Sequence, residues 1–346
     1  MIVVVTTPQG RHTIDSYLAL GGASVRDVLT VWTYPELAAR RARGPLPAGT
    51  YVFADVERTT ARTRAEAADI WQELQADAAR WRTLGHPERT PRRLALLERL
   101  HAQGVNDFRA WRADLPAPGD ARFPVFVRVA DDHDGPRGDL LDDRAALVKE
   151  LSRIAGGGDD LARWIVTEYA GAPRPDGTFV KHGAFVVDGA ILPRHIFLAR
   201  RWIVKYGEVS SADVMHGEWC LLATGSPHAA LLAEVCREAH IGWGRIDYDV
   251  DPTGRVRIWE INTNPQIVPV HIARTPLRRS YTLAWQRRFE ALVRALDARV
   301  PSPPARVGWL ERARWRALVA DDEVIGLPLE RRLWGWARAA WTHLRR

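Results

Sequence analysis

Residues 244–264, GRIDYDVDPTGRVRIWEINTN, constrain the fold of this chain more than any other segment. Two runs that alternate apolar and polar residues flank the sequence DPTG. In this sequence Pro252 suits the first corner of a tight turn, and Gly254 tolerates a positive φ. The pattern predicts an antiparallel β-hairpin. Because a hairpin has two distinct faces, the pattern also predicts which side chains lie together.

The register of this hairpin follows from the turn. If Thr253 and Gly254 form the loop, Asp247 lies opposite Glu260, and a bulge at Gly254 shifts this register by about one residue. One face then presents charged and polar side chains, namely Arg245, Asp247, Asp249, Glu260 and Asn262. The opposite face can pack on a core and presents Ile246, Tyr248, Val250, Trp259 and Ile261.

The polar face predicts a metal site. Carboxylate and amide oxygens are the ligands that Mg²⁺ and Mn²⁺ prefer, and clustered carboxylates repel each other unless a cation lies between them. The alternative is a two-stranded ribbon with a solvated polar face. Glu260 directly follows the apolar residues Ile258 and Trp259, and this position favours the metal site.

The remaining chain predicts a mixed α/β protein. In residues 1–115 the strand-like runs IVVVTT and TYVFADVE alternate with helical patterns, one of them over residues 64–84. Residues 113–124 are rich in proline and small residues and indicate a domain boundary. Further strands and helices follow, including a hairpin whose turn is the Asp188-Gly189 pair.

The hairpin at 244–264 resembles the metal-binding hairpin of ATP-grasp enzymes, and especially that of D-alanine–D-alanine ligases. Their motif places Arg-x-Asp on one strand and Glu-x-Asn-x-x-Pro on the next, as RID and EINTNP do here. The resemblance implies that Asp247, Glu260 and Asn262 bind a pair of Mg²⁺ (or Mn²⁺) ions against the phosphates of ATP. It implies that Arg245 stabilises the oxyanion of a tetrahedral intermediate.

Other segments are similar to further parts of this family. Arg128, in FPVFVR, occupies the position of a phosphate-binding lysine, and the loop after it is acidic and contains His133 where the family has glycines. Lys205, in WIVKYGE, is in the position of the lysine that reaches the terminal phosphate. Lys181 lies where the strand after the hinge begins. The stretch IVTEYAG is similar to the hinge that binds adenine through the backbone of Glu168, Tyr169 and Ala170.

The composition supports the choice of lysines. All but three of the 49 lysine and arginine residues are arginines, and two of those three lysines are Lys181 and Lys205. A compact ammonium group and a guanidinium fork are not interchangeable on a phosphate. The net charge is +7 and the pI is about 9.8. An arginine-rich composition accounts for this charge without a specific nucleic-acid partner, although anionic lipid or nucleic acid remains the alternative.

The expected fold is therefore an α/β (α+β) ATP-grasp fold. It comprises an N-terminal α/β domain over residues 1–115, an ATP-grasp domain over 116–300 with a hinge near 168–171, and a helical extension over 301–346. The extension is rich in tryptophan and arginine. Its tryptophans are expected to pack on the protein or on a second subunit of a homodimer, and peripheral membrane contact is the alternative.

The resemblance implies an ATP- and Mg²⁺-dependent ligase. Such an enzyme converts a small carboxylate into an acylphosphate, which an amine then attacks to form a C–N bond. One alternative is a phosphotransferase that acts on a hydroxyl group; another is a non-catalytic ATP-binding protein whose tail binds membranes or nucleic acid. P-loop and protein-kinase motifs are absent from the sequence. The two cysteines form no disulfide framework, which favours the cytoplasm.

Overall fold

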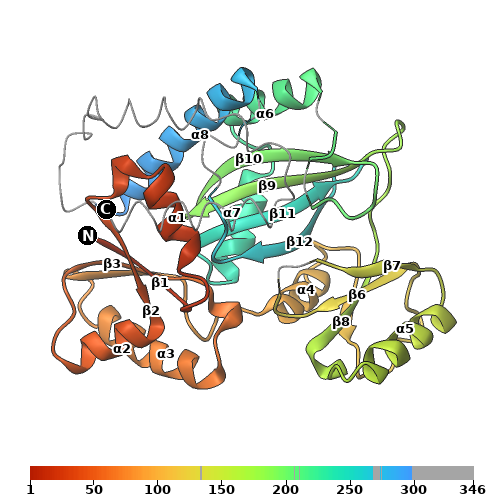
Figure 1. The fold of residues 1–346 in the computed structure, drawn as a ribbon, viewed down its shortest axis with the longest axis horizontal. Coiled ribbons are helices and arrows are strands. Elements are labelled where there is room, and N and C mark those ends of the chain that lie inside the picture. Colours follow the sequence, from red (N-terminus) through yellow and green to blue (C-terminus); the bar gives the residue numbers. More distant parts are fainter. Residues whose placement is uncertain (133–134, 206, 210, 268–272, 274, 298–346) are drawn as a thin grey trace. The chain divides into compact units, whose positions relative to one another are not determined.

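The computed structural model describes residues 1–132, 135–205, 207–209, 211–267, 273 and 275–297 (Figure 1). The fold is mixed α/β, as predicted. It divides into two compact units that are interleaved along the sequence. His133 and the predicted helical extension over 301–346 lie outside the described residues, and the proposed domain bounds stay predictions. Within the described residues, no helix is long and apolar enough to cross a membrane.

The first unit comprises Met1–Val52, Glu73–Thr83 and, in its described part, residues 264–267, 273 and 275–297. It contains a four-stranded sheet in the order β2-β1-β3-β4, in which β1 and β2 are parallel. The strands are β1 (Ile2–Thr6), β2 (Leu29–Thr33), β3 (Gly49–Phe53) and β4 (Trp81–Leu84). The helices are α1 (His12–Leu20), η1 (Ala23–Val25), α2 (Tyr34–Ala42) and α8 (Pro276–Ala295).

The helix predicted over residues 64–84 is wrong at its C-terminal end. Helix α3 spans Ala61–Gln75, and the chain then turns at Asp77, whose carboxylate and carbonyl oxygens both accept hydrogen bonds from the amide of Arg80. The carbonyl of Arg80 accepts a hydrogen bond from Gly49, at the start of β3. Pairing with the sheet therefore overrides the helical periodicity and makes residues 81–84 a strand.

The second unit comprises Phe53–Gln72 and Leu84–Thr263 and contains two antiparallel four-stranded sheets. The smaller sheet has the order β5-β8-β6-β7, with β5 (Ala110–Arg112), β6 (Val125–Val129), β7 (Arg137–Leu141) and β8 (Trp164–Glu168). The larger sheet has the order β10-β9-β11-β12, with β9 (Phe179–Val187), β10 (Ala190–Ala199), β11 (Trp243–Val250) and β12 (Val256–Asn262). The helical elements of the second unit are η2 (Val56–Arg58), most of α3, α4 (Arg93–Ala102), α5 (Arg144–Gly156), η3 (Leu161–Arg163), α6 (Ala212–Thr224) and α7 (Ala229–Glu238).

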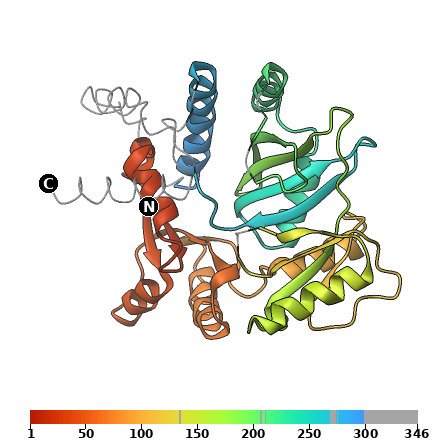
Figure 2. The same cartoon turned by 45° about the vertical axis from the view of Figure 1, so that its right-hand side comes forward.

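One face of the larger sheet packs on helices α4 and α7 (Figures 1 and 2). Their leucines, including Leu96 and Leu232, form a core with Ile246, Ile258 and Ile261 of the sheet. This core leaves the opposite face of the sheet for polar side chains, because neighbouring residues of a strand point to opposite faces.

The predicted hairpin turn at Asp188 and Gly189 is confirmed. Val187 of β9 pairs with Ala190 of β10, and both turn residues have positive φ angles, of 52° and 80°. Positive φ at both central residues is the signature of a two-residue turn that matches the twist of the flanking strands. This local signal therefore determined the β9–β10 connection.

Candidate functional site

The hairpin of β11 and β12 brings the predicted carboxylates together. Asp247 is paired directly with Glu260, and Arg245 with Asn262, as the sequence predicted. The turn is one residue longer than expected, because Asp251 donates its amide to the carbonyl of Arg255 over 2.9 Å. A β-bulge next to the Asp247 pair then restores the predicted register. Two deviations of one residue each therefore cancel at the site.

The bulge corrects the predicted position of Trp259. This residue was expected on the core face, but Ile258 occupies that face as the partner of Tyr248. The ring of Trp259 instead stacks on Phe108, with centroids 4.4 Å apart and planes 15° from parallel. The extra residue on β12 has this effect because a shift of one position exchanges the two faces of a strand.

Two basic side chains hold the carboxylate of Asp247. Lys181 Nζ of β9 lies 3.0 Å from Oδ2, and Arg245 Nε lies 2.7 Å from Oδ1. Burial alone would raise the pKa of Asp247, but Arg245 and Lys181 outweigh it and hold the pKa well below its ordinary value. Asp247 is therefore ionised at neutral pH.

Two arginines hold the carboxylate of Glu260. Arg93 Nη2, at the start of α4, lies 3.0 Å from Glu260 Oε2, and Arg128 Nη1 of β6 lies 3.4 Å from the same oxygen. Both arginines are buried, and among the described residues neither Nε has a hydrogen-bond partner. Burial and the nearby Arg93 lower the pKa of Arg128 to about 10, so it remains charged. Two guanidinium groups on one carboxylate leave an excess of positive charge.

The sequence did not predict Arg93 as a residue of this site. It lies in a helical run with many arginines, and no spacing distinguishes it from Arg92 or Arg99. Only the fold brings it to Glu260, which is more than 160 residues away in the chain. Arg128, by contrast, was predicted from its strand, and the structure places it beside Glu260.

The predicted hinge lies at the end of β8. Both oxygens of the Glu168 carboxylate are held by Arg109 and Arg122, with Arg109 Nη2 2.7 Å from Oε1. The amides of Glu168 and Tyr169 donate to the carbonyls of Arg109 and Pro124, each over 2.9 Å. These two amides are thus engaged within the protein, while Ala170 follows at the strand end. Any backbone contact to a base here would come from other groups of the hinge.

Aromatic rings gather beside this hinge. The ring of Tyr169 lies 6.2 Å from that of Trp259 and 5.3 Å from that of Trp202, which also lies 5.3 Å from the ring of Phe126. Aromatic rings supply flat apolar surface on which a purine can stack. The arrangement therefore suits a nucleobase in the position that the hinge implies.

The other predicted residues differ in their surroundings. Lys205 is exposed in the connection between β10 and α6, whereas Asn262 is half-buried at the end of β12. Asp249 is buried next to Arg257, which binds Asp107 through two hydrogen bonds of 2.7 and 2.8 Å. Burial raises the pKa of Asp249 to about 7, against the effect of Arg257. The pKa of Asp249 is therefore raised whereas that of Asp247 is lowered, although both residues lie on β11.

The side chains present fit a divalent cation bound together with a polyphosphate. Asp247, Glu260 and Asn262 offer only oxygen donors, as Mg²⁺ prefers. Among the described residues, no three histidine, cysteine, aspartate or glutamate side chains already form a metal-binding cluster. The two carboxylates are neutralised by protein cations instead. The buried arginine Nε atoms without partners indicate that this region suits an anionic ligand as well.

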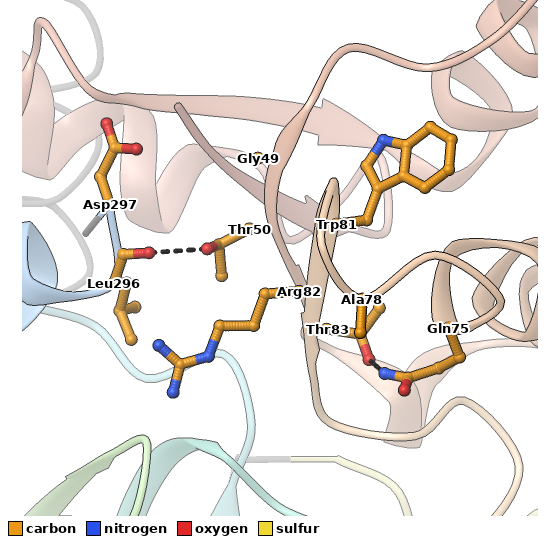
Figure 3. Close-up of a pocket in the computed structure, with 9 residues that line it drawn as sticks. All are labelled: Gly49, Thr50, Gln75, Ala78, Trp81, Arg82, Thr83, Leu296 and Asp297. Carbon is orange, nitrogen blue, oxygen red and sulfur yellow. Dashed lines mark hydrogen bonds between the residues drawn. The ribbon is translucent and has the colours of Figure 1, made fainter. Parts of the chain in front are cut away.

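A separate cavity of about 250 Å³ lies within the first unit (Figure 3). Its lining comprises Gly49, Thr50, Gln75, Ala78, Trp81, Arg82, Thr83, Leu296 and Asp297. The Thr50 hydroxyl donates to the carbonyl of Leu296 over 2.7 Å, and Asp297 accepts from the amino group of Met1 over 2.6 Å. None of the predicted site residues lines this cavity, so it is distinct from the carboxylate site.

The chain is loosely similar to solved structures of known proteins. No protein family and no curated protein matches the sequence. The solved structure of an L-amino acid ligase from Bacillus licheniformis aligns over 76% of this chain and 66% of its own, with 13% sequence identity and a TM-score of 0.37. The matched part thus spans just under two thirds of that ligase.

Proposed function

We propose that this chain is an ATP-grasp-like, Mg²⁺-dependent ligase that activates a carboxylate with ATP. The observation that carries the proposal is the directly opposed pair of Asp247 and Glu260, each held by two basic side chains. Two carboxylates among four protein cations leave an excess of positive charge. Such a site suits metal ions on the carboxylates and phosphates on the basic side chains. Asn262, two residues beyond Glu260, adds a neutral oxygen donor.

In the proposed reaction, a carboxylate oxygen of the substrate attacks the terminal phosphorus of ATP. The bond to the bridging oxygen breaks, and ADP leaves with that electron pair. The amine of a second substrate then attacks the acyl carbon and loses a proton, and inorganic phosphate leaves. Arg93, Arg128, Lys181 and Lys205 bind the phosphates, and Arg245 stabilises the oxyanion. Bound Mg²⁺ would neutralise phosphate charge between Asp247, Glu260 and Asn262.

The aromatic rings beside Tyr169 support the nucleotide part of this proposal. A base stacked there would place its phosphates toward the same unit's basic residues, of which Arg128 belongs to β6, the strand paired with β8. The amine and carboxylate substrates are proposed as small molecules, and the protein is proposed to act in the cytoplasm. No nucleic acid is required as a partner.

The test is ADP release by the purified full chain. It is measured with ATP and Mg²⁺ against a panel of amino acids and small carboxylates, with EDTA as the metal-free control. Release that requires both Mg²⁺ and a carboxylate, with equal amounts of inorganic phosphate, is the expected result. A stable phosphoester in place of inorganic phosphate would show a phosphotransferase. ATP binding without turnover on any substrate would contradict the ligase assignment.

A further inference from the structure

A row of four paired residues crosses the larger sheet of the second unit. His195 of β10 pairs with Gly183 of β9, Gly183 pairs with Asp247 of β11, and Asp247 pairs with Glu260 of β12. Figures 1 and 2 show these four strands side by side in this order. Directly paired residues of an antiparallel sheet project from the same face. The His195 side chain therefore lies on the face that carries the two carboxylates.

Gly183 makes room for the imidazole of His195. A Cβ atom at Gly183 would lie 2.4 Å from both Cε1 and Nε2 of His195, far inside contact distance. The ring thus covers the Gly183 backbone on the side of Asp247. It also stacks on Phe197, with centroids 3.8 Å apart and planes 10° from parallel. A glycine within a strand and an aromatic neighbour therefore fix the direction of this imidazole.

The imidazole has an unused hydrogen-bonding atom. Nε2 of His195 is buried and has no hydrogen-bond partner among the described residues. Burial, together with the nearby Arg245, holds the pKa of His195 well below its ordinary value, so the ring is neutral and carries one N–H donor. Leaving a buried polar atom unpaired costs free energy, and a bound ligand that pairs with it recovers that cost.

We propose that His195 is a substrate-binding and positioning residue, whose Nε2 donates a hydrogen bond to an anionic oxygen bound beside Arg245. This inference rests on the proposed function. Two oxygens have the required chemistry, one on the terminal phosphoryl group of the nucleotide and one on the carboxylate of the second substrate. Both would lie on the face shared by Asp247, Arg245 and Lys181, where basic side chains favour an anion.

The chain contains a matched control for this proposal. His182, the neighbour of Gly183 on β9, also has a buried nitrogen without a partner among the described residues. Its ring stacks on Tyr248, with centroids 5.3 Å apart, and Tyr248 belongs to the core on the opposite face of the sheet. Both histidines thus lie in strands of the same sheet, have a buried nitrogen and stack on an aromatic ring. They differ in the face of the sheet from which they project.

The experiment compares four variants with the wild-type protein. His195→Phe keeps the aromatic stack and removes both nitrogens, whereas His195→Gln places an amide N–H near the position of Nε2. His195→Asn is equally polar but too short to reach that position, and His182→Phe is the control. For each we would measure the dissociation constant of a non-hydrolysable ATP analogue with Mg²⁺ by calorimetry. The KM for the carboxylate and kcat would be measured by ADP release.

We expect the affinity for one of these two ligands to fall about 10-fold or more in His195→Phe and His195→Asn. The affinity should recover in His195→Gln and stay at the wild-type value in His182→Phe. A lower affinity for the ATP analogue identifies the phosphoryl oxygen as the ligand of His195. A higher KM for the carboxylate alone identifies the substrate carboxylate. Wild-type constants in both His195→Phe and His195→Asn would overturn this inference alone. A wild-type protein that binds neither analogue nor carboxylate would overturn the proposed function together with it.

Discussion

Asp247 of β11 and Glu260 of β12 face each other directly across the hairpin, and their four basic partners come from four different elements. Lys181 and Arg245 hold Asp247 from the larger sheet itself, while Arg93 and Arg128 reach Glu260 from α4 and β6. The two carboxylates therefore connect the larger sheet with the elements packed around it.

Substitution of Asp247 by asparagine should abolish metal-dependent turnover without unfolding the protein. The amide has nearly the same shape, but it is a poorer metal ligand and leaves Lys181 and Arg245 without their anion. We expect ADP release to fall by about 10²-fold or more. Asp188→Asn removes a carboxylate from the β9–β10 turn of the same sheet and should leave the rate unchanged. Equal rates in both variants would contradict a role of Asp247 in catalysis.

Substitution of Arg93 by glutamine should weaken nucleotide binding. A charge-assisted hydrogen bond contributes about 1.5–3 kcal/mol, which corresponds to roughly a 10- to 100-fold loss of affinity. Arg99→Gln removes the same charge from the exposed side of the same helix and serves as the control. Isothermal titration with an ATP analogue and Mg²⁺ measures both. Similar affinities in the two variants would show that Arg93 has only a structural role.

Substitution of Glu260 by glutamine should have opposite effects on two ligands. Without metal, Glu260 competes with phosphate for Arg93 and Arg128, so its neutralisation should strengthen binding of tripolyphosphate in EDTA. With metal, the variant lacks a carboxylate ligand and should bind the Mg²⁺–nucleotide complex more weakly. We expect changes of about 10-fold in each direction, measured by calorimetry. A loss in both titrations would argue against this competition.

Stability at low pH should depend on Glu168. Burial would raise its pKa, but the hydrogen bonds from Arg109 and from the amides of Arg122 and Arg109 outweigh burial and lower the pKa below 4.5. The Glu168 carboxylate thus binds a proton less readily in the folded state than in the unfolded state. Glu168 therefore stabilises the fold above pH 4.5, and this contribution is lost as the pH falls through the lower folded value.

Denaturant unfolding as a function of pH tests this dependence. The free energy of unfolding of the wild type should fall more steeply below pH 4.5 than that of Glu168→Gln. The exposed Glu98→Gln is the control for loss of a carboxylate and should follow the wild-type curve. Parallel curves for wild type and Glu168→Gln would show that the arginine contacts do not contribute in this way.

The turn of the β11–β12 hairpin should tolerate asparagine better than alanine at Gly254. This residue has a φ of +87°, and a Cβ added there meets no atom within 4 Å, so only backbone conformation opposes a side chain. Gly254→Ala should reduce the free energy of unfolding by about 1–2 kcal/mol, and Gly254→Asn by less. Thermal and denaturant unfolding measure the difference. A neutral alanine substitution would show that the turn rearranges without cost.

Local patterns of the chain predicted much of the carboxylate site. The strand runs on both sides of DPTG and the Asp188-Gly189 pair determined two hairpins, since turn residues and alternation act over a few positions. The predicted pairing of Asp247 with Glu260 is confirmed, although the turn is one residue longer than expected and a bulge compensates for it. The helix over residues 64–84 was predicted by equally local reasoning, and there a sheet contact prevailed over periodicity.

The surroundings of the carboxylates were decided by the tertiary structure. The bulge that turns Trp259 onto Phe108, the approach of Arg93 and the position of His195 over Gly183 all depend on contacts between residues far apart in the sequence. Such contacts are not encoded in spacing along one strand or helix. The sequence by itself determined that Asp247 and Glu260 lie on the two strands of one hairpin, and the bulge then brought them directly opposite each other. Packing of the strands and of α4 decided which cations neutralise them, because burial makes unpaired charge costly and selects the partners within reach.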